Sequence, residues 1–244
     1  MKKLQIKLKN NEKVYFLGDF HLGAPDKDQS NRRERNIISF LDSIKSDVKE
    51  LFLMGDLFDF WFEYKEVIPK GFVRFFGKIA EISDKGTNIH LIVGNHDMWV
   101  KNYFTEELNI NIHHKLINVI INDKSLLVGH GDGLGKGDIS YKIFKTIFSN
   151  NLIKFLCQWI HPDLGIKIGK FFSKDNKIQE NNNQSINNNN NNNNRLYDYC
   201  KKIENQSHND YYVFGHTHMP CEKTIGKNSK YINVGDCIKD CSYL

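Results

Sequence analysis

Polar side chains follow a glycine at the end of five apolar segments of this 244-residue chain. The segments read FLGDFHLG, FLMGDLFDF, LIVGNHD, LLVGHGDG and YVFGHTH, and they supply Asp19, His21, Asp56, Asn95, His96, His130, His216 and His218. Ligands of α/β sheets bind beyond the carboxyl ends of the strands, so five such ends can meet in one crevice. Carboxylate and imidazole groups together hold divalent first-row metals. The pattern therefore predicts a metal site.

The spacing within the segments indicates how these groups could act. Residues two apart on an extended backbone point the same way, so Asp19 and His21 form one candidate pair, and His216 and His218 another. Two metals about 3.5–4 Å apart, bridged by one aspartate, clamp a phosphoryl group and activate water at neutral pH. Each segment alone is more typical of a strand-end turn whose polar groups bind nearby backbone. The five together favour a metal centre.

The segments that must position these groups alternate between strands and helices. Apolar runs predict strands at 14–18, 50–55, 89–94, 210–215 and 231–235, three- and four-residue spacing predicts helices at 36–44 and 71–83, and a hairpin is predicted at 117–129 with Asn122 and Asp123 at its turn. Such alternation indicates an α/β domain with a mainly parallel sheet and some antiparallel pairs.

The pattern changes between residues 139 and 205. Large apolar side chains at helical spacing predict two helices within 139–160, and the Asn-rich tract 181–194 lacks the apolar surface needed to offset its ordering entropy. We therefore expect a core of residues 1–138 and 206–244, a helical cap insertion at 139–205 and a disordered tract at 181–194. The cap could line a groove for acyl chains, or its apolar residues could simply pack it onto the core. The candidate lining residues are Phe144, Ile147, Phe148, Leu152, Phe155, Leu156 and Trp159.

Composition limits the kinds of partner and the cellular compartment that we expect for the protein. The formal net charge of +5 is spread along the chain, so a phosphate ester, a nucleotide or an anionic membrane surface would each suit it as well as nucleic acid. Five cysteines without a CxxC spacing predict free thiols in a reducing compartment. The first residues lack the apolar region of a signal peptide, and no run of 18 apolar residues occurs. These features predict a cytoplasmic protein that could touch a membrane.

The five segments, in this order, resemble those of the calcineurin-like metallophosphoesterases over about residues 14–236. That resemblance implies a four-layer α/β/β/α sandwich with a dinuclear metal site. It implies that Asp19, His21, Asp56 and His218 hold one metal and that Asp56, Asn95, His130 and His216 hold the other. Asp56 would be the bridge, and His96 would stand beside the leaving oxygen. The catalytic residues implied are thus His96, Asn95 and Asp56.

Further motifs narrow the resemblance. GDLFDFWFEY, GNHDMWV, HGDGLGKGDISYK, CQWIHPDLGIKIGKFFS and GHTHMP are similar to segments of the UDP-2,3-diacylglucosamine pyrophosphatases of lipid A synthesis, in the form found in Bacteroidetes. That family implies hydrolysis of the lipid nucleotide to UMP and 2,3-diacylglucosamine 1-phosphate, with two divalent ions, manganese expected. It also implies peripheral attachment to the cytoplasmic face of the inner membrane, and no nucleic-acid partner. Substrate contacts implied or suggested by position are Asn95, His96, Asp138, Tyr141 and Arg195.

The chain departs from that family after Ser173, where basic cap residues give way to the Asn-rich tract. Lys174, Lys177 and Arg195 are candidates for the missing positive charge. Two other hypotheses stay open. A general phosphodiesterase or nuclease of the same fold should present a broad basic groove, whereas this insertion is apolar. A non-catalytic scaffold should lack metal ligands, whereas every expected ligand position is filled here.

Overall fold

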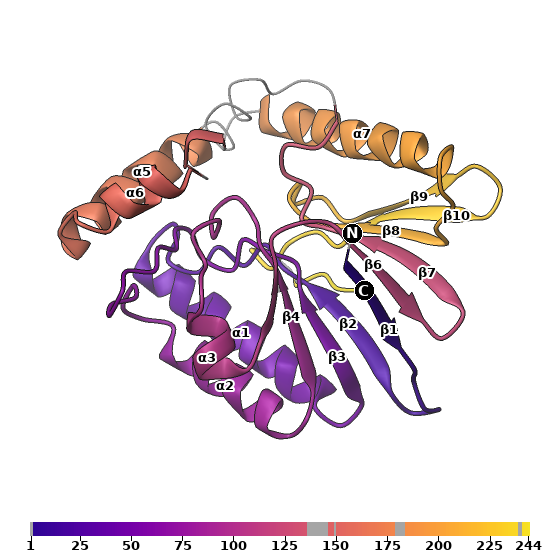
Figure 1. Ribbon diagram of the computed structural model, residues 1–244, viewed down its shortest axis with the longest axis horizontal. Helices are drawn as coiled ribbons and strands as arrows, with labels where there is room; N and C mark the ends of the chain where they lie inside the picture. Colours follow the sequence, from indigo (N-terminus) through magenta and orange to yellow (C-terminus); the bar gives the residue numbers. More distant parts are fainter. Residues whose placement is uncertain (1, 136–145, 149, 179–183, 239–240) are drawn as a thin grey trace.

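Two β-sheets form the centre of the protein in the computed structural model, which describes residues 2–135, 146–148, 150–178, 184–238 and 241–244 (Figure 1). The four-stranded sheet has the order β2-β3-β4-β5, with β2 at Lys13–Leu17, β3 at Val48–Leu53, β4 at Asn88–Ile92 and β5 at Asn111–His113. The six-stranded sheet has the order β1-β6-β7-β8-β10-β9. Its strands are β1 at Lys2–Ile6, β6 at Ile117–Ile121, β7 at Lys124–Val128, β8 at Tyr211–Phe214, β9 at Cys221–Ile225 and β10 at Ser229–Asn233.

The four-stranded sheet is parallel throughout, and both of its faces are covered. Successive side chains of a strand point to opposite faces. Leu51 and Leu53 therefore pack against the helices α1 (Lys27–Ile44), α2 (Val73–Asp84) and α3 (Tyr103–Leu108), while Phe52 faces the other sheet. Burial on both faces explains why these strands read as continuous apolar runs in the sequence.

The six-stranded sheet is mixed, with parallel pairs β1–β6, β7–β8 and β8–β10 and antiparallel pairs β6–β7 and β9–β10. The β6–β7 pair confirms the predicted hairpin, with Asn122 at positive φ in its turn. Helix α7 (Gln184–Glu204) covers the outer face of the six-stranded sheet (Figure 1). Leu196 and Cys200 of α7 pack on Tyr212 and Tyr231 of that sheet. The order helix, sheet, sheet, helix confirms the four-layer α/β/β/α sandwich.

Helix α7 differs from the expected disordered tract. Residues 184–194 belong to this helix, and residues 181–183 lie outside the described part of the chain. The Oδ1 atom of Asn193 accepts hydrogen bonds from Thr217 Oγ1 and Tyr231 Oη, at 2.8 and 2.9 Å. These contacts, together with packing of Leu196, anchor the asparagine-rich end to the core. The C-terminal half of α7 is thus the fourth layer of the sandwich, although we expected it to belong to the cap.

The remaining insertion holds α5 (Asn151–Cys157) and α6 (Pro162–Ile178), which lie to one side of the two sheets (Figure 1). Its large side chains are mostly exposed, which contradicts the interpretation that they only pack the insertion onto the core. Exposed side chains include Leu152, Phe155, Leu156 and Trp159 on and just after α5, and Leu164, Ile168 and Phe171 on α6. Phe144 lies outside the described residues. We refer to these seven exposed residues as the apolar cap surface.

The sequence predicted that all five cysteines carry free thiols, and this prediction is wrong for two of them. Cys237 and Cys241 form a disulfide in the C-terminal segment, and Cys157, Cys200 and Cys221 are free. Within the described ranges, none of the helices combines the length and apolar character that crossing a bilayer requires.

Candidate metal centre

The loops that follow five strands bring the predicted ligands to one edge of both sheets. Asp19 and His21 follow β2, Asp56 follows β3, Asn95 and His96 follow β4, His130 follows β7, and His216 and His218 follow β8. The extended backbone expected at Asp19, His21, His216 and His218 is wrong, because all four residues have φ between 44° and 71°. The chain turns sharply at these four residues; Asp19 and His21 still join one group of ligands, whereas His216 and His218 join different groups.

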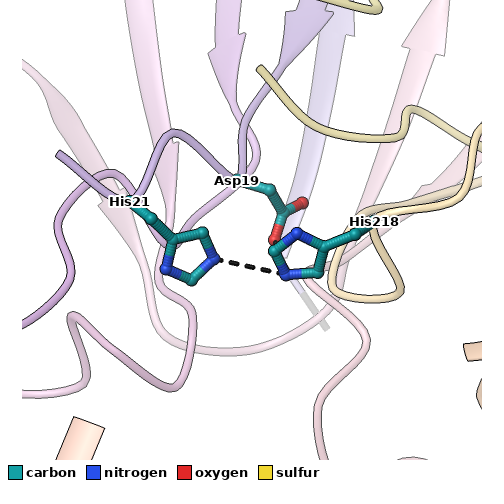
Figure 2. Close-up of side chains that lie close together, drawn as sticks. All are labelled: Asp19, His21 and His218. Atoms are coloured by element: carbon teal, nitrogen blue, oxygen red, sulfur yellow. Dashed lines mark hydrogen bonds and ion pairs between the residues drawn. The ribbon is translucent and has the colours of Figure 1, made fainter. Parts of the chain in front are cut away.

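One group of ligands is formed by Asp19, His21 and His218, whose ligand atoms all lie within 4.8 Å of one another. His21 Nε2 lies 3.2 Å from His218 Nε2, and Asp19 Oδ1 lies 3.8 Å from the same atom of His218. Figure 2 shows the three side chains converging from two separate loops. These residues come from both ends of the chain, so the group exists only in the folded protein.

A second group is formed by Asp56, His130 and His216. Asp56 Oδ2 lies 3.4 Å from His130 Nε2, and Asn95 Oδ1 lies 3.2 Å from the same nitrogen. Asp56 also joins the first group, since its Oδ2 atom lies 3.7 Å from His21 Nε2. One carboxylate therefore stands between the two groups, in the place that a bridging ligand would take.

These donors fit a pair of divalent cations. Asp19, Asp56, His21 and His130 are each at most 2 % exposed, and a buried carboxylate without compensation is costly. Asp19 Oδ1 has no hydrogen-bond partner among the described residues, although its Oδ2 accepts from the His216 amide at 3.0 Å. A carboxyl oxygen left unsatisfied beside imidazole nitrogens is the arrangement that a bound cation would satisfy.

The electrostatics of these side chains show the same need for positive charge. Burial raises the pKa of Asp19 to about 6, although His218 and His130 oppose that shift. Burial also lowers the pKa of His216 to about 3, which keeps its ring neutral and able to act as a ligand. Burial acts against the charged forms of Asp56 and His130, but their mutual attraction prevails. The pKa of Asp56 lies well below its usual value, and that of His130 well above.

Three histidines are oriented by contacts of their Nδ1 atoms with residues outside the two ligand groups. The Nδ1 atoms of His130 and His96 lie 2.7 Å from the carbonyl oxygens of Met54 and Asp59, to which they can donate. His218 Nδ1 lies 3.2 Å from Asp236 Oδ2. In each case Nε2 is left to point at the centre, which is how protein ligands to metals are commonly oriented.

Two supporting residues were missed by the sequence interpretation. Asp236 follows β10 in the segment YINVGD, so it carries the same strand–glycine–carboxylate signal as the ligands. Arg33 lies on α1, where the sequence offers no such signal. Its buried Nη1 donates to the carbonyl oxygens of Phe20, His21 and Ala24. Arg33 thereby fixes the loop that presents His21.

Two glycines leave room for the ligands themselves. A Cβ atom on Gly94 would overlap Asp56 Oδ1, and a Cβ on Gly55 would lie 2.7 Å from His130 Nδ1. Gly55 also has a φ of +89°, which side-chain-bearing residues rarely adopt. The strand–glycine pattern of the sequence thus reflects the crowding of donors behind the centre.

Only some of the residues suggested as substrate contacts lie beside the metal ligands. His96 Nε2 lies 4.0 Å from Asp56 Oδ2, at the edge of the centre. Arg195 lies on α7, where its Nη1 donates to Asn192 Oδ1 at 3.0 Å. Asp138 and Tyr141 lie outside the described residues. Asn95 and His96 therefore lie at the centre. The substrate contacts suggested for Asp138, Tyr141 and Arg195 stay predictions.

Comparison with known proteins identifies the family of this chain. The family model described as calcineurin-like phosphoesterase matches residues 12–220. A UDP-2,3-diacylglucosamine hydrolase of Porphyromonas gingivalis is 32% identical over 95% of this chain and 92% of its own length. A protein of the same name from Shewanella baltica is 25% identical over the same shares of both chains. A solved Aquifex aeolicus protein of unknown function is 15% identical, with a TM-score of 0.48, over 96% of this chain and 95% of its own. The chain belongs to the calcineurin-like phosphoesterase family.

Proposed function

We propose that this protein is a hydrolase that cleaves the pyrophosphate bond of UDP-2,3-diacylglucosamine, giving UMP and 2,3-diacylglucosamine 1-phosphate. The observation that carries the proposal is the buried arrangement of two ligand groups around Asp56. The relative from Porphyromonas gingivalis, matched along nearly the whole chain, is named for this substrate. The apolar cap surface could bind acyl chains, and a nuclease would not need such a surface.

The cations would be held by the two groups already described. Asp19, His21, Asp56 and His218 would bind one, and Asp56, Asn95, His130 and His216 the other. Mixed carboxylate, amide and imidazole donors suit manganese, which we propose as the metal. Two such ions, when bound, stabilise negative charge on the phosphoryl oxygens and lower the pKa of water.

The chain's own residues would orient and complete the reaction. Water attacks the α-phosphorus, a new P–O bond forms, and the bond to the bridging oxygen breaks, so that the sugar phosphate leaves with that oxygen. His96 is proposed to point Nε2 at the reacting phosphoryl group, because its Nδ1 is engaged by the Asp59 carbonyl. A proton held at Nε2 would stabilise charge on a phosphoryl oxygen or pass to the leaving oxygen.

The apolar cap surface is proposed to hold the two acyl chains or to rest on the membrane that contains them. Trp159 is 78 % exposed and Leu152 is 65 % exposed, and several large apolar side chains exposed on two consecutive helices are typical of an interaction site. Lys167 and Lys170 are exposed on α6 beside it, where they would face anionic headgroups. We therefore propose peripheral attachment at the cytoplasmic face of the inner membrane.

The test is the reaction of purified protein with manganese and UDP-2,3-diacylglucosamine in water enriched in oxygen-18. Release of UMP that carries the label is expected, because the attack is proposed at the α-phosphorus. The His96→Ala variant is expected to lose about 100-fold or more in kcat while keeping its metal content. His208→Ala, which alters a surface histidine beside Glu204, is the matched control and should keep full activity.

Three outcomes would overturn parts of the proposal. Cleavage of bis-p-nitrophenyl phosphate but not of the lipid nucleotide would indicate a general phosphodiesterase. Metal binding without hydrolysis of either compound would indicate a scaffold. Label in the sugar phosphate instead of UMP would place the attack on the other phosphorus.

A further inference from the structure

Helix α6 of the insertion packs on the loop that carries Asp59 through a stripe of small residues. Gly165, Gly169 and Ser173 are spaced four apart and so lie along one side of the helix. A Cβ atom on Gly169 would overlap the ring of Phe60, and one on Gly165 would overlap the hydroxyl of Tyr64. The helix backbone therefore lies directly against the segment 59–64, which leads away from Asp56.

Ser173 ends this stripe in a polar contact beside the metal centre. Its Oγ atom lies 2.7 Å from Asp59 Oδ1 and 2.9 Å from the Asp59 carbonyl oxygen, and the side chain is 6 % exposed. The same Oγ lies 3.3 Å from His96 Nδ1. One hydroxyl proton serves one acceptor, and the shorter contact is the one to Asp59 Oδ1. The oxygen lone pairs of Ser173 then face the His96 N–H, beside the Asp59 carbonyl.

We propose that Ser173 is a positioning residue for His96, so that docking of the cap helix α6 on segment 59–64 sets the orientation of the catalytic imidazole. Ser173 touches neither ligand group and acts through Asp59 and His96. The same α6 helix carries Leu164, Ile168 and Phe171 of the apolar cap surface. The substrate-binding insertion and the reacting histidine are thereby joined by one buried hydroxyl. This inference rests on the role proposed above for His96.

A purely structural serine would predict different behaviour. Ser229 is fully buried on β10 and donates to Glu204 Oε1 at 2.9 Å, which makes it a matched hydroxyl–carboxylate contact remote from the centre. Removing either hydroxyl should lower the melting temperature by a similar amount. Only removal of the Ser173 hydroxyl should alter the histidine.

The experiment is a double-mutant cycle with the full-length, manganese-loaded protein and bis-p-nitrophenyl phosphate, a small phosphodiester that needs no cap contact. Ser173→Ala is expected to lower kcat by about tenfold with little change in KM and none in metal content. In a His96→Ala background the same change is expected to have no effect on kcat, because the group through which Ser173 acts is gone. Ser229→Ala should leave kcat unchanged in both backgrounds.

Hydrogen exchange provides a readout that does not depend on activity. Ser173→Ala should speed amide exchange in α6 and in residues 59–64 together, and Ser229→Ala should leave both segments as in wild type. If Ser173→Ala folds too poorly to assay, Gly169→Ala disturbs the same contact from the neighbouring turn. It is expected to give the same loss of kcat and the same faster exchange.

The proposal fails if Ser173→Ala leaves kcat unchanged, or if it lowers kcat equally with and without His96. It also fails if α6 and segment 59–64 exchange independently. These results differ from failure of the proposed function, which would appear as wild-type protein that cleaves the small diester but not the lipid nucleotide. If wild type cleaves neither compound, the exchange experiment alone decides whether α6 docks through Ser173.

Discussion

Removal of divalent ions is expected to lower the stability of this protein sharply, because the donors come from both sheets. Asp19 and Asp56 follow strands of the four-stranded sheet, and His130 and His218 follow strands of the six-stranded sheet. A ligand present at 100 times its Kd, and bound only by the folded state, adds about 2.7 kcal/mol. Two such ions would add about 5 kcal/mol. At about 2–4 °C per kcal/mol for a chain of this size, the expected rise in melting temperature is about 10–20 °C.

The assay is a calorimetric melt of chelator-treated protein titrated with manganese chloride. Asp56→Asn weakens the carboxylate shared by both groups and should remove most of the rise. Asp42→Asn is the matched control, since Asp42 pairs with Lys78 on the surface and should leave the rise intact. The reasoning is refuted if saturating manganese leaves the melting temperature of wild type unchanged, or if Asp56→Asn responds to manganese as wild type does.

Three further changes test separate parts of the structure. Gly94→Ala should expel metal and cost about 1–3 kcal/mol of folding free energy because its Cβ would overlap a carboxylate; elemental analysis checks this, and Gly77→Ala, whose Cβ meets open space, should bind metal normally. Burial beside His90 lowers the pKa of His113 from 6.5 to about 4, so the unfolded chain takes up the proton first and the free energy of unfolding should fall as the pH drops across that range. Urea melts of His113→Gln should show a fall smaller by on the order of 1–2 kcal/mol, and an identical pH profile would contradict this account. Trp159→Ala should raise KM for the lipid nucleotide by about tenfold at most without affecting bis-p-nitrophenyl phosphate; Val73→Ala, an equally exposed apolar change away from the cap, should alter neither.

Local patterns in the sequence were sufficient to predict an α/β domain and the set of converging residues, whereas the four layers were predicted only through the family resemblance. Strands buried on both faces appear as short apolar runs, and a glycine followed by polar donors marks where they end. Asp236 could have been found by the same rule, since it follows Val234 and Gly235 at the end of β10.

Other features depend on contacts that no local pattern carries. The asparagine-rich part of α7 contacts the core through Asn193, which meets Thr217 and Tyr231, residues more than 20 positions away along the chain. The support that Arg33 gives to the His21 loop arises only when α1 packs under it. The left-handed conformations of Asp19, His21, Asp56, His216 and His218 were likewise not predicted, because positive φ is uncommon even for Asp and His and depends on the surrounding structure.

The separation of the ligands along the chain determines when activity can begin during biosynthesis. His21 and His218 are 197 residues apart, yet their ring nitrogens face each other at 3.2 Å. A ribosome must therefore have added residue 218 before the two groups of ligands can form. Nascent and prematurely terminated products that end before residue 216 lack both His216 and His218, so neither group of ligands is complete in them.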